Sequence, residues 1–365
     1  MRATLISAGE PAPWFTCRTS SNERYVFDSV GGRFILLSFF ESAAQPEAAR
    51  LLEALRSRRA RFDDDNLAFF GVSCDPEDER SGRLADELPG LRYFFDFDRA
   101  VSGLYGAARP EGAYRPVTYL LDPMLRVCAV WSARDGVAPP LESLLHIVYR
   151  VPRLSAGHRA RPQAPVLVLP YVFEPALCKA LVDYFDAHGG EESGFMRDEN
   201  GRTVRVVEPG HKRRRDCVID DVKLKHACMV RMRDRLIPEV AKAFQFKPTR
   251  MERYIIGCYD AAENGHFRPH RDNTTLGTAH RRFAVSLFLN TGEYDGGHLC
   301  FPEFGTALHS VPPGGAVVFS CALLHEATPV TRGRRYMFLP FLYDEEARAM
   351  RKENFRFLQP EPAAA

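Results

Sequence analysis

Three side chains in the second half of the chain form a pattern that predicts a metal site. His270 and Asp272 are two residues apart, and His325 lies 53 residues beyond Asp272. Residues two apart on an extended segment project to the same face, so His270 and Asp272 are able to share one ion. Two imidazoles and one carboxylate form the facial set that suits non-haem Fe(II) and leaves coordination positions open. The same ligands also fit catalytic zinc, so the identity of the metal needs a second criterion.

An arginine-rich stretch after His325 supplies that criterion. Residues 331–335 run Thr-Arg-Gly-Arg-Arg. A guanidinium forms a bidentate pair with a carboxylate, which suits a keto-acid co-substrate. A zinc hydrolase would need a general base, and the chain has no HExxH motif to supply one. The pattern therefore favours iron with a keto-acid. Neighbouring strand residues face opposite sides, so only one of Arg334 and Arg335 can point inward, and the spacing does not choose between them.

The composition predicts an ordinary globular protein. The chain has 365 residues, 45% of them hydrophobic, and a net charge of +2, so we expect two packed domains with no overall attraction to nucleic acid or anionic membranes. The nine cysteines are scattered singly, which favours a reducing compartment. No apolar run is long enough to cross a bilayer, and the start of the chain lacks an apolar signal core. We therefore expect a soluble cytoplasmic protein. The basic run at 211–215 is interpreted as a solvated loop.

The order of predicted elements changes at a Pro-, Gly- and Arg-rich segment. Before it, buried strands alternate with helices, one of them expected at 78–88, which favours an α/β layer fold. After it, two helical segments precede many short strands from Met251 onward, typical of a double-sheet or barrel β fold. The polar segment 189–218 is expected to be a substrate-covering loop. We predict an α/β domain at residues 1–150, a linker at 151–164, a β domain at 165–350 and a C-terminal tail at 351–365.

Several motifs in the second domain go beyond the three metal-ligand candidates. They lie at residues 254–259, 267–272, 294–301, 312–319 and 325–335. With these motifs, the region from about 165 to 344 resembles the Fe(II)/2-oxoglutarate-dependent dioxygenases, and most closely the prolyl 4-hydroxylase branch. The resemblance implies a double-stranded β-helix, a jelly-roll relative. It also implies Fe(II) held by His270, Asp272 and His325, with 2-oxoglutarate as co-substrate and ascorbate as a candidate reductant.

The resemblance also assigns roles around the co-substrate. It implies that Arg335 pairs with the distal carboxylate of 2-oxoglutarate, although many collagen-type relatives carry lysine there. Tyr259 resembles the tyrosine that hydrogen-bonds the same carboxylate, and the alternative is a core aromatic residue. The implied reaction hydroxylates a C–H bond and releases succinate and CO2. The substrate, whether a peptide, an amino acid or a small metabolite, is not readable from the sequence.

The first domain resembles the peroxiredoxins, which have a thioredoxin-like fold, through residues 9–13, 73–75 and 105–123. The family's Thr-x-x-Cys-Pro loop aligns with residues 42–46, where Ser42 and Pro46 keep the pattern but Gln45 replaces the peroxidatic cysteine. A peroxidase needs a thiolate nucleophile, which an amide cannot supply. Arg115 resembles the arginine that activates that thiolate. We interpret the domain as a non-catalytic docking or dimerisation module, and expect a homodimer through it. Peroxidase activity through Cys74 is a minor hypothesis.

Three classes of function remain open at this point. The leading one is a 2-oxoglutarate-dependent oxygenase acting on a small-molecule or peptide substrate. The second is a zinc- or other metal-dependent hydrolase that uses the same ligands. The third is a non-catalytic binding protein in which both domains are degenerate, and the complete ligand set argues against it.

Overall fold

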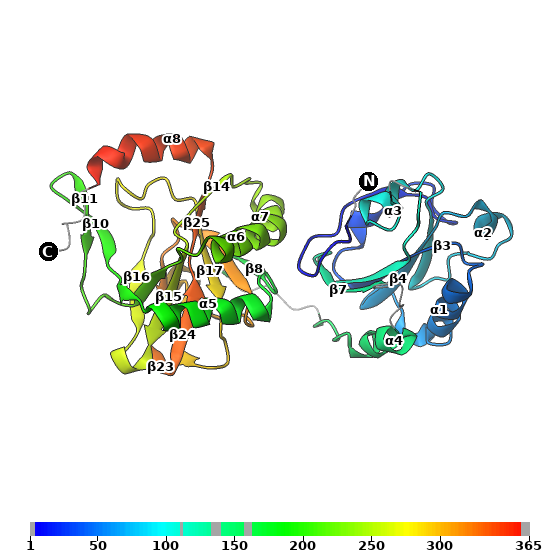
Figure 1. Ribbon diagram of the computed structural model, residues 1–365, viewed down its shortest axis with the longest axis horizontal. Helices are drawn as coiled ribbons and strands as arrows, with labels where there is room; N and C mark the ends of the chain where they lie inside the picture. The colour runs from blue at the N-terminus through cyan, green and yellow to red at the C-terminus, as the bar shows by residue number, and fades with distance from the viewer. Residues whose placement is uncertain (1–3, 110–111, 133–139, 157–162, 359–365) are drawn as a thin grey trace. The chain divides into compact units, whose positions relative to one another are not determined.

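The structure is a computed structural model that describes residues 4–109, 112–132, 140–156 and 163–358 (Figure 1). Its contacts divide the chain into two compact units, Met1–His158 and Arg159–Ala365. The division falls inside the segment 151–164, for which the proline, glycine and arginine content predicts a linker. Each unit is described by itself.

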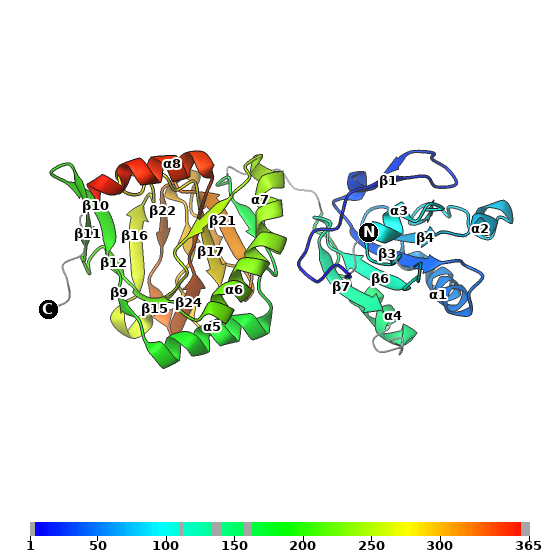
Figure 2. The same ribbon diagram turned by 45° about the horizontal axis from the view of Figure 1, so that its top comes forward.

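The first unit is built on a five-stranded sheet of order β5-β4-β3-β6-β7. Strands β3, β4 and β5 pair in parallel, whereas β6 pairs antiparallel with β3 and β7 pairs antiparallel with β6. Helices α1 and α4 lie on one face of the sheet and α3 on the other (Figure 2). The elements are β3 (Phe34–Glu41), α1 (Pro46–Arg56), β4 (Leu67–Ser73), α2 (Pro76–Arg80), β5 (Leu91–Phe95), α3 (Ala100–Leu104), β6 (Val117–Leu121), β7 (Val127–Ser132) and α4 (Leu141–Arg150), with a short pair β1 (Thr16–Cys17) and β2 (Tyr25–Val26) before them.

The central strands of this sheet are continuous apolar runs because both of their faces are covered. All seven residues of β4 are buried, as are the inner six of β3. Helix α1 buries Ala48, Leu52 and Leu55, which recur at helical spacing and form one face. The predicted α/β fold is confirmed. The helix expected at 78–88 is wrong, since α2 ends at Arg80 and Gly82 turns the chain with φ of +66°.

The second unit consists mainly of two antiparallel sheets. A five-stranded sheet has the order β12-β16-β22-β19-β20. A nine-stranded sheet contains β14, β25, β17, β24, β15, β13 and β9 in order, and β21 pairs with β17 on one side and with β8 on the other. The strands of the smaller sheet are β12 (Lys212–Arg213), β16 (His266–His270), β19 (Leu299–Cys300), β20 (Leu308–His309) and β22 (His325–Ala327). Those of the larger are β8 (Leu167–Leu169), β9 (Glu191–Glu192), β13 (Arg215–Val218), β14 (Arg250–Glu252), β15 (Ile255–Asp260), β17 (Phe283–Phe288), β21 (Ala316–Ser320), β24 (Arg334–Phe338) and β25 (Phe341–Tyr343).

The apolar core of this unit joins residues of both sheets. Phe267 and Leu299 come from the smaller sheet, and Phe288 and Met337 come from the larger one. Side chains alternate along each strand, so one face of each sheet fills the space between them. The predicted double-sheet β fold is confirmed. We expected single strands at 251–259 and 335–343, but each is divided in two. The first is divided at Arg253, whose φ is +65°, and the second at Pro340, which cannot donate a ladder hydrogen bond.

Helices lie against the larger sheet, as Figures 1 and 2 show for α5, α6 and α7. They are α5 (Pro175–His188), α6 (Val222–Arg231), a π-helical turn (Met232–Leu236), α7 (Ile237–Phe244) and α8 (Glu345–Asn354). The boundary predicted at 350 is wrong because α8 continues to Asn354 and a 3-10 turn follows it. Among the described residues, none of the helices combines the length and apolar character that a membrane crossing requires.

The segment 189–218 is a set of strands rather than the loop that we expected. Besides β9, β12 and β13, it forms the hairpin of β10 (Phe195–Glu199) and β11 (Arg202–Val206). The hydroxyl of Thr203 donates to Asp198 and accepts a hydrogen bond of 2.9 Å from the Gly277 amide, which fixes the hairpin to a neighbouring loop. Local polarity concealed this pairing because hairpins exposed on one face carry few apolar residues.

Glu174, directly before α5, ties the helices together. Its carboxylate accepts hydrogen bonds from Arg231, at the end of α6, and from Arg235 at 2.8 Å in the π-helical turn. Burial alone would raise the pKa of Glu174, but these hydrogen bonds outweigh it and lower the pKa to about 2.

We predict that Glu174→Gln lowers the free energy of unfolding by about 1–3 kcal/mol at neutral pH. The folded-state pKa lies below the ordinary value, so the stabilisation is present above about pH 5 and disappears as the pH falls toward 2. Urea unfolding at neutral and acid pH measures this, with Glu199→Gln at an exposed position as the control. An equal loss for the two variants at neutral pH would contradict the role of Glu174.

Candidate metal and co-substrate site

Pairing of β16 with β22 brings the two predicted histidines together. His270 ends β16 and lies opposite His325, the first residue of β22. Asp272 follows two residues after His270, with 3.6 Å from its Oδ1 to His270 Nε2 and 3.3 Å from its Oδ2 to His325 Nε2. One ligand atom from each of the three residues lies within 4.8 Å of the other two. This spacing allows all three side chains to bind a single ion.

Hydrogen bonds fix the orientation of both imidazoles. His270 Nδ1 lies 2.7 Å from the carbonyl oxygen of Arg268, and His325 Nδ1 lies 3.0 Å from that of Leu323. A carbonyl only accepts, so each Nδ1 carries the proton and donates it. In the neutral tautomer, Nε2 then presents its lone pair toward Asp272. This is the orientation that a metal-binding histidine needs.

The protonation states also suit a cation. Burial, followed by the charge of His325, lowers the pKa of His270 to about 3, so this ring is neutral at physiological pH. Burial would raise the pKa of Asp272, but the neighbouring imidazoles hold it below its usual value. Two imidazoles, with that of His270 uncharged, and a buried carboxylate form a donor set that fits a divalent transition metal.

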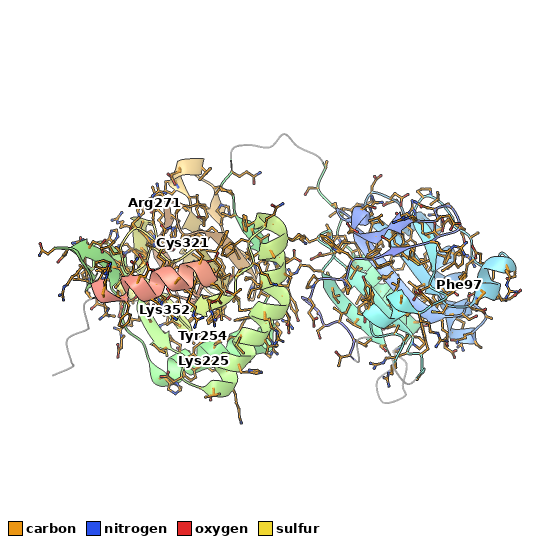
Figure 3. The ribbon with its side chains drawn as sticks, turned by 90° about the horizontal axis from the view of Figure 1, so that it is seen from above. Phe97, Lys225, Tyr254, Arg271, Cys321 and Lys352 are labelled. Atoms are coloured by element: carbon orange, nitrogen blue, oxygen red, sulfur yellow. The ribbon has the colours of Figure 1, made fainter. Side chains whose placement is uncertain are left out.

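The segment that carries Asp272 is held from both sides. The Asp272 amide donates to the Cys321 carbonyl at 2.9 Å, and Arg271 pairs with Glu303 at 2.7 Å. Arg271 and Cys321, labelled in Figure 3, belong to these two neighbouring segments. Such anchoring keeps the carboxylate in place without metal, which favours pre-organised binding.

The three residues line a cavity of about 760 Å³. Its wall combines the hairpin of β10 and β11, the end of β16 and the inner faces of both sheets. Phe267 stacks on His270 with ring centroids 3.4 Å apart, and Phe319 contacts the His325 ring edge to face at 4.6 Å. A cavity of this size suits small-molecule ligands, and an aromatic ring lies against each of the two histidines.

Burial decides between the two adjacent arginines that the sequence left open. Arg335 is 2% exposed and lines the cavity, whereas Arg334 points outward and pairs with Asp260 at 2.8 Å. Within the described part of the chain, Arg335 has no carboxylate partner, and its buried Nε has no hydrogen-bond partner. A buried guanidinium without a counter-ion is costly, so the site fits an incoming carboxylate. A Cβ at Gly297, where φ is +60°, would lie 2.7 Å from Arg335 Cδ, so glycine leaves room for this side chain.

Tyr259 faces the same cavity from β15. It lies directly opposite Arg335 in the pairing of β15 with β24, and its ring centroid is 5.0 Å from the Arg335 guanidinium carbon. Its hydroxyl lies 3.3 Å from Nη1 of Arg214. The ring of Tyr259 is buried, as expected for a core aromatic residue, and the residue also lines the cavity. Its hydroxyl group is polar, so Tyr259 is compatible with both the core role and the carboxylate-binding role considered from the sequence.

The basic residues of the cavity that sequence reasoning missed include Lys212, Arg214 and Arg253. The run 211–215 was expected to be a solvated loop, and this expectation is wrong. Burial alternates along it, with Lys212 and Arg214 buried and their neighbours Arg213 and Arg215 exposed. Alternation is the mark of a strand, but five consecutive basic or histidine residues conceal it because no apolar residue reports which face is covered.

The charged groups around Lys212 differ in how burial and neighbouring charges shift their pKa values. Burial, followed by the positive charge of Arg214, holds the pKa of Lys212 well below its usual 10.5. Burial would raise the pKa of Asp216, but the charges of Arg214 and Lys212 hold it below its usual value. Arg253 stays protonated at neutral pH, although burial lowers its pKa to about 10.

The equivalent of the peroxidase loop in the first unit holds no thiol. Gln45 precedes α1 and donates to Glu41 at 3.1 Å, and the Ser42 hydroxyl donates to Asp75 at 2.7 Å. Cys74 is buried, and burial raises the pKa of its thiol. A buried thiol with a raised pKa is a poor nucleophile. Arg115, the residue that resembles the activating arginine, has a buried Nε without a hydrogen-bond partner in the described residues.

Two protein-family models match the chain. Residues 8–130 match the AhpC/TSA family, and residues 254–343 match the 2OG-Fe(II) oxygenase superfamily. The chain therefore carries an N-terminal AhpC/TSA peroxiredoxin-like domain and a C-terminal 2OG-Fe(II) oxygenase domain. Both domain resemblances predicted from the motifs are confirmed at this level.

Curated relatives include two PKHD-type hydroxylases. The protein from Verminephrobacter eiseniae is 33% identical over 96 residues, which cover 24% of this chain and 40% of the relative. The protein from Hyphomonas neptunium is 30% identical over 116 residues, which cover 30% of this chain and 49% of the relative. The chain thus spans less than half the length of either relative. The C-terminal domain is related to the PKHD-type hydroxylases.

Similar solved structures exist for each domain. A Pseudomonas putida prolyl-4-hydroxylase is 19% identical with a TM-score of 0.39, covering 50% of this chain and 94% of that protein. The AhpC of Mycobacterium tuberculosis is 16% identical with a TM-score of 0.32, covering 40% of this chain and 93% of that protein.

We predict that His325→Ala weakens Fe(II) binding by at least about 10- to 100-fold, because even the loss of an outer partner of a metal ligand costs this much. Anaerobic equilibrium dialysis followed by iron analysis measures the change. His188→Ala, at the exposed end of α5, is the matched control and is expected to bind as the wild type does. Undiminished binding by His325→Ala would exclude this residue as a ligand.

Proposed function

We propose that this protein is an Fe(II)- and 2-oxoglutarate-dependent oxygenase that hydroxylates a C–H bond of its substrate and releases succinate and CO2. The observation that carries the proposal is the content of one cavity. It holds two imidazoles and a carboxylate within reach of a common ion, together with the buried, unpartnered guanidinium of Arg335. A metal alone would explain the first feature, and a dicarboxylate co-substrate explains the second.

Each residue then has a defined task. His270, Asp272 and His325 would hold iron from one side and leave the other side open to ligands. Arg335 donates to the distal carboxylate of 2-oxoglutarate, and the Tyr259 hydroxyl lies on the same side of the cavity. Bound iron would supply the redox chemistry that couples decarboxylation of 2-oxoglutarate to substrate hydroxylation. The protein orients these groups and excludes water through Phe267 and Phe319.

A metal-dependent hydrolase on the same ligands has less support. Hydrolysis would need a carboxylate free to act as general base near the bound water. Apart from Asp272, the least exposed acid that lines the cavity is Asp216, and two arginines already neutralise it. A non-catalytic binding protein would also leave the buried charge of Arg335 without a role.

The direct test is conversion of 2-oxoglutarate to succinate by the full chain with Fe(II) under air, without added substrate. We expect slow turnover that Asp272→Ala abolishes. If the wild type with bound Fe(II) forms no succinate with any substrate pool, whether of peptides, amino acids or small metabolites, the proposal fails. Turnover that persists without Asp272 would also contradict it.

We predict that Arg335→Gln raises the KM for 2-oxoglutarate by about 10- to 100-fold, because a charge-assisted bond to a buried carboxylate is worth about 1.5–3 kcal/mol. Arg334→Gln is a matched control one residue away, where an exposed guanidinium pairs with Asp260. Succinate formation as a function of 2-oxoglutarate concentration measures both. Equal KM values for the two variants would refute the assignment of Arg335.

We further propose that the N-terminal domain is non-catalytic and serves docking or dimerisation. Glutamine at position 45 and the buried Cys74 support this. The full chain is then expected to consume hydrogen peroxide no faster than its Cys74→Ser variant, and light scattering is expected to give twice the mass of one chain. Peroxide consumption that depends on Cys74 would support the peroxidase hypothesis. A mass of one chain in light scattering would contradict dimerisation.

A further inference from the structure

The cavity contains more buried positive charge than the proposed co-substrate can neutralise. Besides the metal-ligand candidates, its lining contains one carboxylate that is not exposed, Asp216, and eight lysine and arginine residues. Two of the eight are exposed and two are paired with carboxylates outside the lining, which leaves four. These four basic residues are Lys212, Arg214, Arg253 and Arg335. The other acids of the lining, Glu191, Glu192 and Asp198, are exposed.

Asp216 is already committed to Arg214. Arg214 donates through Nε at 2.6 Å and through Nη2 at 2.8 Å, a bidentate pair. Its Nη1 lies 3.3 Å from the Tyr259 hydroxyl. These two groups therefore neutralise each other. Another lining arginine, Arg281, is likewise paired with Glu252 at 2.7 Å.

Lys212 has no carboxylate of its own. Its side chain is 3% exposed, and its ammonium donates to two neutral oxygens, the Ser193 hydroxyl at 2.7 Å and the Gly194 carbonyl at 2.6 Å. An ammonium has three N–H donors, so one is left over among the described contacts. The Phe267 ring lies 4.7 Å away, and Phe267 itself stacks on His270. The unused donor is therefore close to the metal-ligand candidates.

Arg253 is the second surplus cation. It shares Asp216 with Arg214 through a single contact of 3.0 Å from Nη2, and the described residues offer its Nε and Nη1 no other acceptor. Its backbone adopts φ of +65°, a region that costs a non-glycine residue roughly 1 kcal/mol or more. That conformation divides β14 from β15 and turns the side chain to the cavity. Strain of this kind is concentrated at functional sites.

The two surplus cations belong to one network. The Ser193 hydroxyl accepts from Lys212 and donates to Asp216 Oδ2 at 2.5 Å, and the same Oδ2 accepts from Arg253. One hydroxyl and one carboxylate oxygen therefore separate the ammonium of Lys212 from the guanidinium of Arg253. An anion placed beside this network gains a donor from each of two elements, β12 and the β14–β15 turn.

We propose that the substrate carries a carboxylate, and that Lys212 and Arg253 bind it in the cavity beside the iron and the co-substrate. This inference rests on the proposed function, because it assigns the distal carboxylate of 2-oxoglutarate to Arg335. The guanidinium of Arg253 then remains for a second anion, together with the Lys212 amine, whose charged form an adjacent carboxylate would favour against the effect of burial. The carboxylate belongs either to a free acid, such as an amino acid, or to an acidic side chain of a peptide. Both would present the same carboxylate group to Lys212 and Arg253.

The test compares carboxylates with their neutral amides on the full chain loaded with Mn(II) and 2-oxoglutarate. The probes are L-proline against L-prolinamide, L-leucine against L-leucinamide, and an acetylated, amidated prolyl-glutamate dipeptide against its prolyl-glutamine analogue. Thermal stabilisation as a function of probe concentration gives the affinity. We expect at least one carboxylate to bind about 10- to 100-fold more tightly than its amide. The pair that shows this preference distinguishes a free acid from an acidic side chain.

Variants assign the preference to the two residues. Lys212→Met and Arg253→Gln are expected to remove it, Lys212→Arg to retain most of it, and the exposed, ion-paired Arg332→Gln to leave it unchanged. The KM for 2-oxoglutarate is expected to stay within about threefold of the wild type in all four.

Three results would overturn the inference: no carboxylate preference in any pair, a preference that survives both Lys212→Met and Arg253→Gln, or a KM for 2-oxoglutarate that rises in these variants as it does in Arg335→Gln. The proposed function has its own readout, since succinate formation without substrate does not depend on which probe binds. If the wild type forms succinate but prefers no carboxylate, only the substrate inference is contradicted. If the wild type forms no succinate, the proposed function itself is contradicted.

Discussion

Pairing of β16 with β22 is the interaction on which the rest of the site depends. It places His270 opposite His325, and the two-residue offset of Asp272 brings the carboxylate to the same point. Backbone carbonyls then fix both imidazoles with Nε2 inward. A shift of the register by one residue would turn one histidine to the other face of the sheet, so the three side chains would no longer lie close enough to share an ion. The hydrogen-bond ladder, rather than the three side chains alone, therefore defines where the candidate ligands meet.

Burial of positive charge is the second organising constraint. The cavity encloses guanidinium and ammonium groups that would be costly without partners, and the protein supplies a full carboxylate partner to Arg214. Arg335, Lys212 and Arg253 have no full carboxylate partner among the described residues. Arg335 and Tyr259 face each other across one strand pair, while Lys212 and Arg253 are linked through Ser193 and Asp216. The basic side chains without a full carboxylate partner thus fall into two groups in one cavity, which we propose to bind the co-substrate and the substrate.

The two domains differ in whether the residues that their family resemblances lead us to expect at the reactive site are present. In the first, the sheet and its helices are intact, but the position that defines peroxidase chemistry holds an amide, and the nearby Cys74 is buried with a raised pKa. In the second, the three metal-ligand candidates lie close together and line one cavity with Arg335. A fold can persist after its chemistry is lost because packing of apolar strands and helices does not depend on the reactive residue.

The sequence by itself determined the two-domain organisation, the fold class of each half, and the grouping of His270, Asp272 and His325, because apolar periodicity and motif spacing are local properties of the chain. It did not decide between Arg334 and Arg335, since alternation separates two neighbours without saying which face is inside. It also missed Lys212, Arg214 and Arg253, whose basic character is typical of exposed loops. Only tertiary structure could place them, because their burial depends on strands far away in the chain, and the value of a buried charge depends on which partners surround it.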